Sequence, residues 1–232
     1  MSDLDPSDDP LVRQFIADGI DEKPARIQVA ALRLFANQGY AATSVRDIVE
    51  TADVTNPMLY YYFDNKHGLF TSLIDHLFES IAEDVEAIVD EPTPIEVVLE
   101  TIATTYFEAC RDFPDVLRFI YSVLCGPRES RPDFTLPEAY QHMLGQIQER
   151  LRKAIGDGEL SPPRGFDSTF LTERFMGLVD NQLMGAFALA SHGESWHDAR
   201  ASIDDFVGPS ARTRILHFFF AGAGHPDFKE FS

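Results

Sequence analysis

Residues 24–70 constrain the fold more than any other part of the chain, because their pattern predicts three short helices and the start of a fourth. In the first helix, apolar residues recur at helical spacing over residues 27–35, and Gly39 is placed to end it. Ser44 is placed to cap the second helix, and Asp47 follows three residues later, as in a capping box. These signals divide the region into short, separately capped helices.

The third helix is predicted to be only about two turns long. It begins at Thr55 or Asn56, both of which are good N-caps, and ends at Phe63. The consecutive tyrosines 60–62 cannot all face one core on a 3.6-residue period, so at least one must point outward, whereas Leu59 and Phe63 are predicted to pack inward. Two short helices joined by a turn of about four residues describe a helix-turn-helix, whose second helix can enter the DNA major groove.

The motifs in this region resemble a known family. The signature L-F-x-x-x-G-Y-x-x-T-S-V-x-D-I, followed by A-x-V and by L-Y-Y-x-F-x-x-K, lies within residues 30–70. It is similar to the DNA-binding head of tetracycline-repressor-like (TetR-family) regulators. One position departs from the family pattern, because Asn56 and Pro57 stand where a basic residue and a glycine are usual. A phosphate-binding charge is lost there, and an amide that could contact adenine is gained.

The pattern predicts an all-α fold with an N-terminal three-helix helix-turn-helix head and a C-terminal helical bundle. The resemblance implies that this bundle serves for ligand binding and dimerisation. We expect an acidic flexible arm over residues 1–20, although its apolar residues could form one or two helical turns. A helix-turn-helix DNA-binding domain is expected over residues 21–66, and a helical effector-binding and dimerisation domain over residues 67–232. A long helix from Lys66 to about Val89 is predicted to connect the two.

The formal net charge of −19 argues at first against a nucleic-acid partner. Residues 24–70, however, hold four acidic and four basic side chains, so this segment is neutral in an otherwise acidic chain. Scarce lysine and abundant acid resemble the proteins of salt-accumulating halophiles, in which molar salt screens charges beyond roughly 3 Å. Because such salt weakens phosphate contacts, hydrogen bonds and apolar contacts to bases would carry a larger share of the affinity.

Residues in the second and third helices, with their flanks, form the predicted contact set for double-stranded operator DNA. Within it, Thr43, Tyr61 and Lys66 are predicted to contact phosphates, and Asn56 and Tyr60 are the best candidates for base edges. The full set is Thr43, Ser44, Arg46, Thr55, Asn56, Met58, Tyr60, Tyr61, Tyr62 and Lys66.

Two helices near the C-terminus, about 167–191 and 202–221, are too apolar to be covered on one face alone. An exposed apolar surface usually marks an interface. The resemblance implies that these helices pair with their copies in a two-fold dimer, which places two heads on two half-sites about one DNA turn apart. Ordinary packing into the chain's own core is the alternative.

The resemblance also implies an effector cavity in the helical body, for an apolar or aromatic small molecule. Asp180, Asn181 and Gln182 interrupt an apolar helix, and they could line a pocket, bond across a dimer or face solvent. The side chains of the right type for such a cavity are Tyr106, Phe107, Phe119, Tyr121, Met143, Phe175, Met176, Asn181 and Gln182. Aromatic residues at helical spacing are also common in plain cores.

Other chemistry finds little support in the sequence. His192 and His197 flank a short loop but lack metal-ligand spacing, and we expect no metal and no cofactor. Cys110 and Cys125 lie in apolar helical segments, as expected of reduced thiols in a cytoplasmic protein. The start of the chain is acidic, without a hydrophobic signal segment, and no apolar run is long enough for a membrane span.

Taken with these observations, the resemblance implies a homodimeric, ligand-responsive transcriptional regulator, specifically a repressor released from its operator by a small molecule. The alternative is a helical ligand-binding or interaction protein whose head has lost DNA binding, because the head is neutral and lacks the usual basic residue. A helical enzyme is the third class. It has no support, because the sequence contains no recognisable catalytic set.

Overall fold

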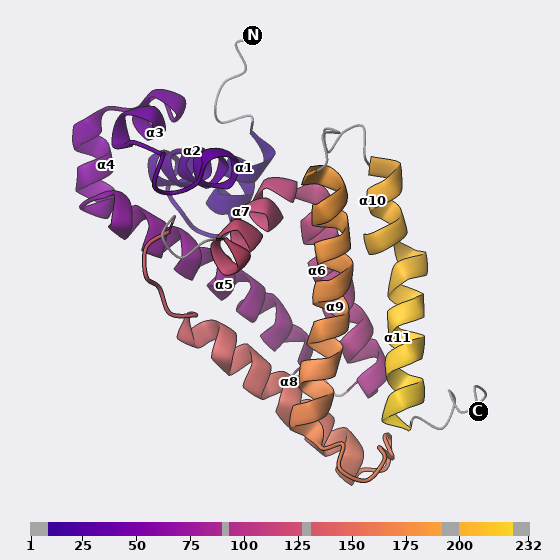
Figure 1. Cartoon of the computed structure of the whole chain (residues 1–232). Helices are drawn as coiled ribbons and strands as arrows, with labels where there is room; N and C mark the ends of the chain where they lie inside the picture. The colour runs from indigo at the N-terminus through magenta and orange to yellow at the C-terminus, as the bar shows by residue number, and fades with distance from the viewer. Residues whose placement is uncertain (1–8, 90–92, 127–130, 192–199, 225–232) are drawn as a thin grey trace. The chain divides into compact units, whose positions relative to one another are not determined.

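The computed structural model of the chain describes residues 9–89, 93–126, 131–191 and 200–224. Within these ranges all regular secondary structure is α-helical, and the helices are labelled α1 to α11 in Figure 1. The predicted all-α class is therefore confirmed. Among the described helices, none combines the length and the apolar character needed to cross a membrane.

The helices fall into two compact units. The first contains residues 1–80 and 115–137, and the second contains residues 81–114 and 138–232. Helix α5 continues from one unit into the other, and α7 belongs to the first unit from Asp115 onward. The bounds are α1 Pro10–Ala17, α2 Glu22–Gln38, α3 Val45–Thr51, α4 Asn56–Phe63, α5 Lys66–Val89, α6 Ile95–Asp112, α7 Pro114–Cys125, α8 Glu138–Gly156, α9 Ser168–Ser191, α10 Arg200–Val207 and α11 Pro209–Ala223.

The predicted stop and start signals of the first unit are confirmed. Gly39 ends α2 with φ = 82°, a backbone conformation that glycine adopts without steric cost. Ser44 caps α3 through a complete capping box, in which its Oγ accepts from the Asp47 amide at 3.1 Å and its own amide donates to Asp47 Oδ2 at 2.9 Å. Thr55 is the N-cap residue of α4.

Helix α1 lies in the segment for which an acidic arm was predicted. Asp9 caps it by accepting from the Leu11 amide at 2.9 Å. Leu11, Val12 and Phe15 are all buried, and α1 packs on α2. Residues 10–17 therefore form an integral helix of the first unit, in line with the helical turns that the apolar residues allowed, whereas residues 1–8 lie outside the described part of the chain.

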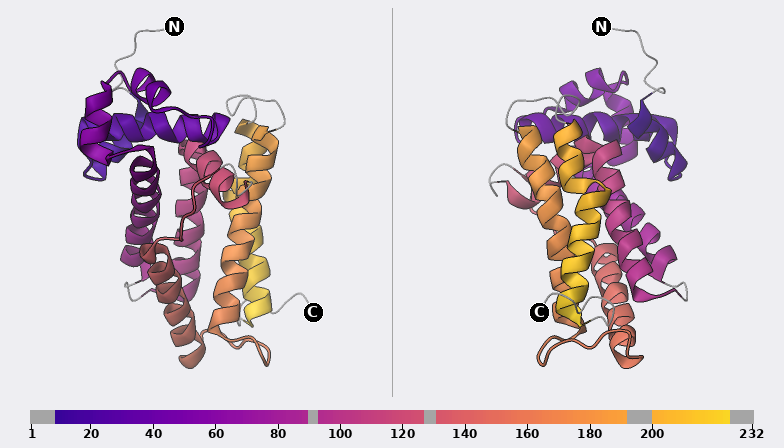
Figure 2. Two further views of the ribbon diagram at one scale, coloured as in Figure 1. Left: turned by 60° about the vertical axis from the view of Figure 1, so that its left-hand side comes forward. Right: turned by 90° about the vertical axis from the view of Figure 1, so that its right-hand side faces the viewer.

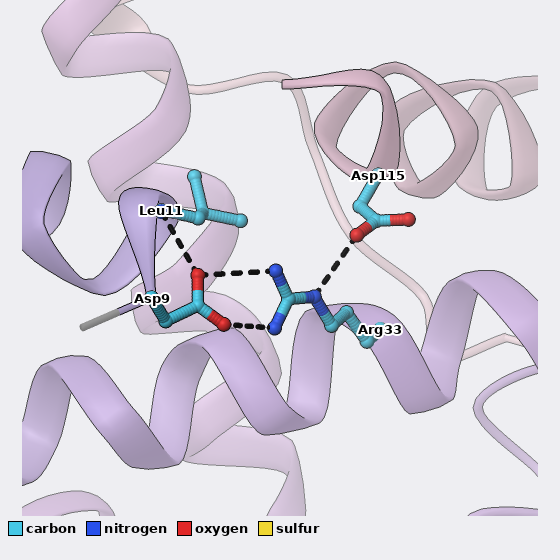
Figure 3. A network of polar contacts seen from close by, with 4 residues as sticks. All are labelled: Asp9, Leu11, Arg33 and Asp115. Atoms are coloured by element: carbon cyan, nitrogen blue, oxygen red, sulfur yellow. Dashed lines mark hydrogen bonds and ion pairs between the residues drawn. The ribbon is translucent and has the colours of Figure 1, made fainter. Parts of the chain in front are cut away.

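An arginine between two carboxylates joins three helices of this unit (Figure 3). Arg33 of α2 forms a bidentate ion pair with Asp9, in which Nη2 lies 3.1 Å from Oδ1 and Nη1 bonds Oδ2. Its Nε donates to Asp115 Oδ2 of α7 at 2.9 Å. Bidentate geometry makes this the stronger kind of ion pair. The start of α1 and the start of α7 are thus both fixed to α2.

The second unit is a bundle of α6 and α8–α11. Figure 2 shows α9 beside α10 and α11 in both views, and Phe175 of α9 packs edge-on against Phe219 of α11 with ring centroids 5.5 Å apart. The first amide of α6 is satisfied by a side chain from the α8–α9 turn, because Ile95 N donates to Glu159 Oε2 at 2.9 Å. Arg150 of α8 lies 3.6 Å from the other oxygen of the same carboxylate.

Candidate nucleic-acid interface

Helices α3 and α4 form the predicted helix-turn-helix. Leu59 of α4 is completely buried and Phe63 is 8 % exposed, which confirms that these two side chains pack inward. They hold one face of an eight-residue helix against α2 and α3. The opposite face of α4 remains available to a partner.

The three consecutive tyrosines lie on that available side. Tyr60 is 50 % exposed, Tyr61 is 81 % exposed and Tyr62 is 36 % exposed, so the prediction that at least one tyrosine points outward is confirmed. The rings of Tyr61 and Tyr62 meet edge-on with centroids 5.0 Å apart. Phenols in such positions can donate to phosphate oxygens or lie against bases.

The first turn of α4 is open as well. Thr55 and Asn56 are exposed, and Met58 is half-buried. Neither the Thr55 hydroxyl nor another side chain caps the start of this helix. Pro57 has no N–H and Met58 N donates to the Thr55 carbonyl at 3.0 Å, so the exposed Asn56 side-chain amide is the group in this turn that can meet hydrogen-bond acceptors from a partner.

At the start of α3, the polar side chains are partly engaged with one another. Ser44 is exposed, but its hydroxyl belongs to the capping box. Arg46 is 81 % exposed and its Nε lies 2.7 Å from Glu50 Oε1, one helical turn away. The charge and hydrogen bond of Glu50 raise the pKa of the Arg46 guanidinium. Because exposed pairs of this kind are weak, the arginine can exchange its partner for a phosphate at little cost.

Thr43 and Lys66, which the sequence predicts to contact phosphates, instead make hydrogen bonds within the chain. Thr43 is 1 % exposed, and its hydroxyl donates to the Gly39 carbonyl at 2.8 Å, so its side chain is withdrawn from the surface. Lys66 Nζ donates to the carbonyls of Tyr40 and Thr43 at 2.9 and 2.7 Å, and lies 4.1 Å from the Tyr40 ring centroid. Partial burial lowers the pKa of this ammonium. Both residues shape the turn between α2 and α3.

Two residues that the sequence analysis missed support this surface. Arg26 of α2 reaches the turn before α4, where its Nη2 donates to the Ala52 carbonyl at 2.7 Å. Asn65 caps α5, because its Oδ1 accepts from the amides of His67 and Gly68 at 2.9 and 3.0 Å. Asn65 carries a recognisable cap signal directly before Lys66, whereas no local pattern links Arg26 to a turn 26 residues away.

The residues predicted for an effector cavity fall into both compact units. Phe119 and Tyr121 belong to the unit that contains the helix-turn-helix, and the others belong to the second unit. In the second unit, Tyr106 and Met143 meet through a hydroxyl–sulfur contact of 3.7 Å. Phe107, Phe175 and Met176 are buried there, whereas Asn181 is exposed and Gln182 is half-buried.

The described residues offer no alternative metal centre. No group of three or more His, Cys, Asp or Glu in the described ranges is arranged to hold a metal ion. His192 and His197 lie outside those ranges. Cys110 is buried and Cys125 is exposed, and both are free thiols.

A helical protein with an exposed second helix in a helix-turn-helix belongs to the class of DNA-binding regulators. Residues 27–73 match the family described as "Bacterial regulatory proteins, tetR family". This segment therefore carries the DNA-binding motif of that family, and the curated relatives that the chain resembles are transcriptional regulators.

Individual transcriptional regulators are similar to the chain over stretches of different length. The chain is 23 % identical over 168 residues to the uncharacterised regulator YfiR of Bacillus subtilis, an alignment that covers 70 % of this chain and 81 % of YfiR. It is 42 % identical over 57 residues to the repressor ComR of Escherichia coli, but this covers only 25 % of this chain and 27 % of ComR. The fold is similar to FadR of Bacillus subtilis, crystallised with stearoyl-CoA, with a TM-score of 0.64, 19 % identity, and coverage of 85 % of this chain and 97 % of FadR.

Proposed function

We propose that the chain is a homodimeric repressor that binds its operator through α3 and α4 and leaves it when a small molecule binds. The observation that carries this proposal is the exposure of Tyr60, Tyr61 and Asn56 on α4, opposite the buried Leu59 and Phe63. Exposed phenols and an exposed amide on a two-turn helix can hydrogen-bond to phosphates and base edges when the helix lies in a major groove. We assign DNA binding to residues 21–66, and effector binding and dimerisation to residues 67–232.

Within the contact set, the structure supports different roles for different residues. Tyr61 and Arg46 are each 81 % exposed, and we assign them to phosphates. Asn56 and Tyr60 are assigned to base edges, and Met58 to an apolar base contact such as a thymine methyl. Thr43 and Lys66, in contrast, are assigned to holding the turn that presents α3.

The dimer is proposed to form through α9 and α11. On α11, Phe218 is 71 % exposed, with Ala221 and Gly222 exposed one turn further on. On α9, Met184 is 37 % exposed, and Asn181 lies three residues before it on the same face. An exposed phenylalanine among small side chains allows close approach of a second copy of these helices. Replacing Phe218 with Glu is expected to convert the dimer to a monomer, which light scattering after size-exclusion chromatography measures.

The effector is proposed to be apolar or aromatic and to bind among the helices of the second unit. Buried Phe107, Met143 and Phe175 supply apolar surface of the kind that such ligands need. FadR, the similar structure described above, was crystallised with stearoyl-CoA, an acyl thioester with a long apolar chain. We therefore place long-chain acyl compounds first among the molecules to be tested, with single-ring aromatic compounds next.

Release from DNA follows if the effector binds more tightly to one arrangement of the two heads than to another. The shift in operator affinity cannot exceed the difference in effector affinity between the two arrangements. We further propose that the protein works in a cytoplasm of high salt, because its net charge is −19. Under those conditions base contacts, rather than phosphate contacts alone, must supply the specificity.

The proposed function is tested by titrating the full chain into labelled duplexes from the DNA beside its own gene, over a series of KCl concentrations. We expect one duplex to bind specifically, with a shallow dependence on salt, and stearoyl-CoA or another acyl-CoA to release it. Asn56→Ala is expected to lower the preference for that duplex, whereas exposed Lys23→Ala, on α2, is the matched control. Equal binding to all duplexes at every salt concentration would instead support an interaction protein whose head no longer recognises DNA.

A further inference from the structure

A cavity of about 170 Å³ lies inside the compact unit that contains the helix-turn-helix. Its walls come from the end of α2 and the residue after Gly39, from α5 and from α7, and Arg131 stands at its edge. All of its lining residues belong to the first unit. The cavity is therefore separate from the effector site proposed for the second unit.

Four of its ten lining residues are aromatic, namely Phe35, Tyr40, Phe70 and Phe119. Phe70 of α5 is the centre of this group, with its ring centroid 5.3 Å from that of Tyr40, 6.0 Å from that of Phe35 and 5.9 Å from that of Phe119. The contacts to Phe70 are all edge-to-face, which is a favourable arrangement for aromatic pairs. An apolar cavity of roughly 150 Å³ is large enough for benzene, so this one suits a single aromatic ring.

Arg131 gives the cavity one cationic group. Its guanidinium carbon lies over the Phe134 ring, 4.9 Å from the ring centroid, which is a cation–π contact. Its Nε is buried and has no hydrogen-bond partner. A buried charged donor without an acceptor is costly, which indicates that an acceptor is missing beside it.

The other polar groups at the cavity do not supply that acceptor. The Ser122 hydroxyl donates to the Phe119 carbonyl at 2.7 Å. The Tyr40 phenol is protonated at neutral pH and can donate, and burial raises its pKa further. Lys66 places a second positive charge 4.1 Å from the Tyr40 ring centroid. Arg131 thus brings a positive charge, and Tyr40 a hydroxyl donor, to the lining of an aromatic cavity, and together they favour an anionic ligand.

We propose that this cavity is a second ligand site, which binds a small aromatic carboxylate. The ring of the ligand lies among Phe35, Phe70 and Phe119, and its carboxylate accepts from Arg131. Because the cavity is walled by α2, α5 and α7, a bound ring stabilises the unit that carries the helix-turn-helix.

Sodium benzoate is the probe for this proposal, and benzyl alcohol is its uncharged counterpart of nearly the same shape. Each is titrated into the full chain by isothermal calorimetry, in parallel with thermal unfolding. We expect benzoate to bind one site per chain and to raise the unfolding temperature, and benzyl alcohol to bind at least tenfold more weakly. Equal affinity for both compounds would contradict the anionic class of the ligand.

Substitutions in and near the cavity test whether benzoate binds there. Arg131→Gln is expected to weaken benzoate binding at least tenfold, and Arg118→Gln, which removes the same charge from α7 outside the cavity lining, is expected to leave it unchanged. Val123→Phe, which fills the cavity, is expected to abolish binding. Unchanged binding to Arg131→Gln would overturn the proposal, and this variant remains decisive if the cavity-filling variant fails to fold, as circular dichroism would reveal.

Discussion

Arg26 and Ala52 form a long-range contact that fixes the helix-turn-helix: Arg26 Nη2 donates to the Ala52 carbonyl oxygen at 2.7 Å. The same nitrogen lies 3.3 Å from the carbonyl oxygen of Asp53, the residue after Ala52, whose φ is 52°. Such a positive φ is uncommon outside glycine and is retained where neighbouring contacts hold it. Arg26 therefore stabilises the turn that sets the direction of α4.

Arg26→Gln is expected to weaken both folding and DNA binding. The shorter, uncharged side chain leaves the turn carbonyls without their donor, at a cost of about 1–3 kcal/mol in free energy of unfolding. The change is measured by chemical denaturation, and operator affinity is measured at a temperature at which the variant is folded. Lys23→Gln removes the same charge from the exposed face of α2 and should change neither quantity. Unaltered operator affinity in folded Arg26→Gln would show that the turn does not depend on this contact.

The ion pair between Asp9 and Arg33 predicts loss of stability in acid. Burial disfavours the Asp9 carboxylate, but the hydrogen bond and charge of Arg33 outweigh it and hold the pKa of Asp9 below its ordinary value of 3.8. A lowered folded-state pKa adds stability above pH 3.8, and this contribution is lost as the pH falls through the folded-state pKa.

Asp9→Asn isolates this charge, because asparagine can still cap α1. At neutral pH the wild type is expected to be more stable than the variant by about 1 kcal/mol, as for a partly exposed pair. The difference should vanish at the acid end of a series of denaturant titrations. A difference that is constant over the whole pH range would contradict the assignment to an ion pair.

Gly185 marks a close approach of α9 and α10. A Cβ at this position would lie 2.3 Å from Cδ1 of the Phe206 ring, which must then move. Gly185→Ala is therefore expected to lower the free energy of unfolding by about 1–3 kcal/mol through overpacking. Gly145→Ala in α8 is the matched control, because its Cβ would meet nothing within 4 Å, and it should be neutral or slightly stabilising.

The two cysteines are expected to differ strongly in reactivity. Burial raises the pKa of the Cys110 thiol to about 12, so the reactive thiolate is scarce, whereas Cys125 is exposed. At mildly alkaline pH, a colorimetric disulfide reagent should react with one thiol per folded chain and with two after denaturation. Cys125→Ser should abolish the fast reaction. Rapid modification of Cys110 in the folded variant would mean that α6 opens readily.

Local signals in the sequence were sufficient to predict the helices of the head. The stop at Gly39 and the capping box of Ser44 and Asp47 depend on residues within a single turn of each other, and the structure contains both. The inward packing of Leu59 and Phe63 follows from helical periodicity. Such features are predictable because the residues that form them are neighbours in the chain.

Contacts between distant segments were not predictable in the same way. Arg33 meets Asp115 across 82 positions, and no periodicity or cap pattern links the two. For the same reason Phe119 was predicted for an effector site by residue type, whereas in the structure its ring lies among Phe35 and Phe70 of the head. Burial of Thr43 also depends on a turn geometry that its neighbours alone do not define.

The central claim is that the exposed face of α4 contacts DNA, and Tyr61 tests it most directly because 81 % of its side chain is exposed. Tyr61→Ala should therefore leave folding intact, and Phe166→Ala serves as a control for loss of an exposed aromatic side chain in the second unit. The measurement is the affinity of each variant for the best-bound duplex from the DNA beside the gene, at one stated salt concentration. We predict that Tyr61→Ala binds roughly tenfold more weakly or worse, whereas Phe166→Ala binds as the wild type does. Wild-type affinity in folded Tyr61→Ala would contradict the account.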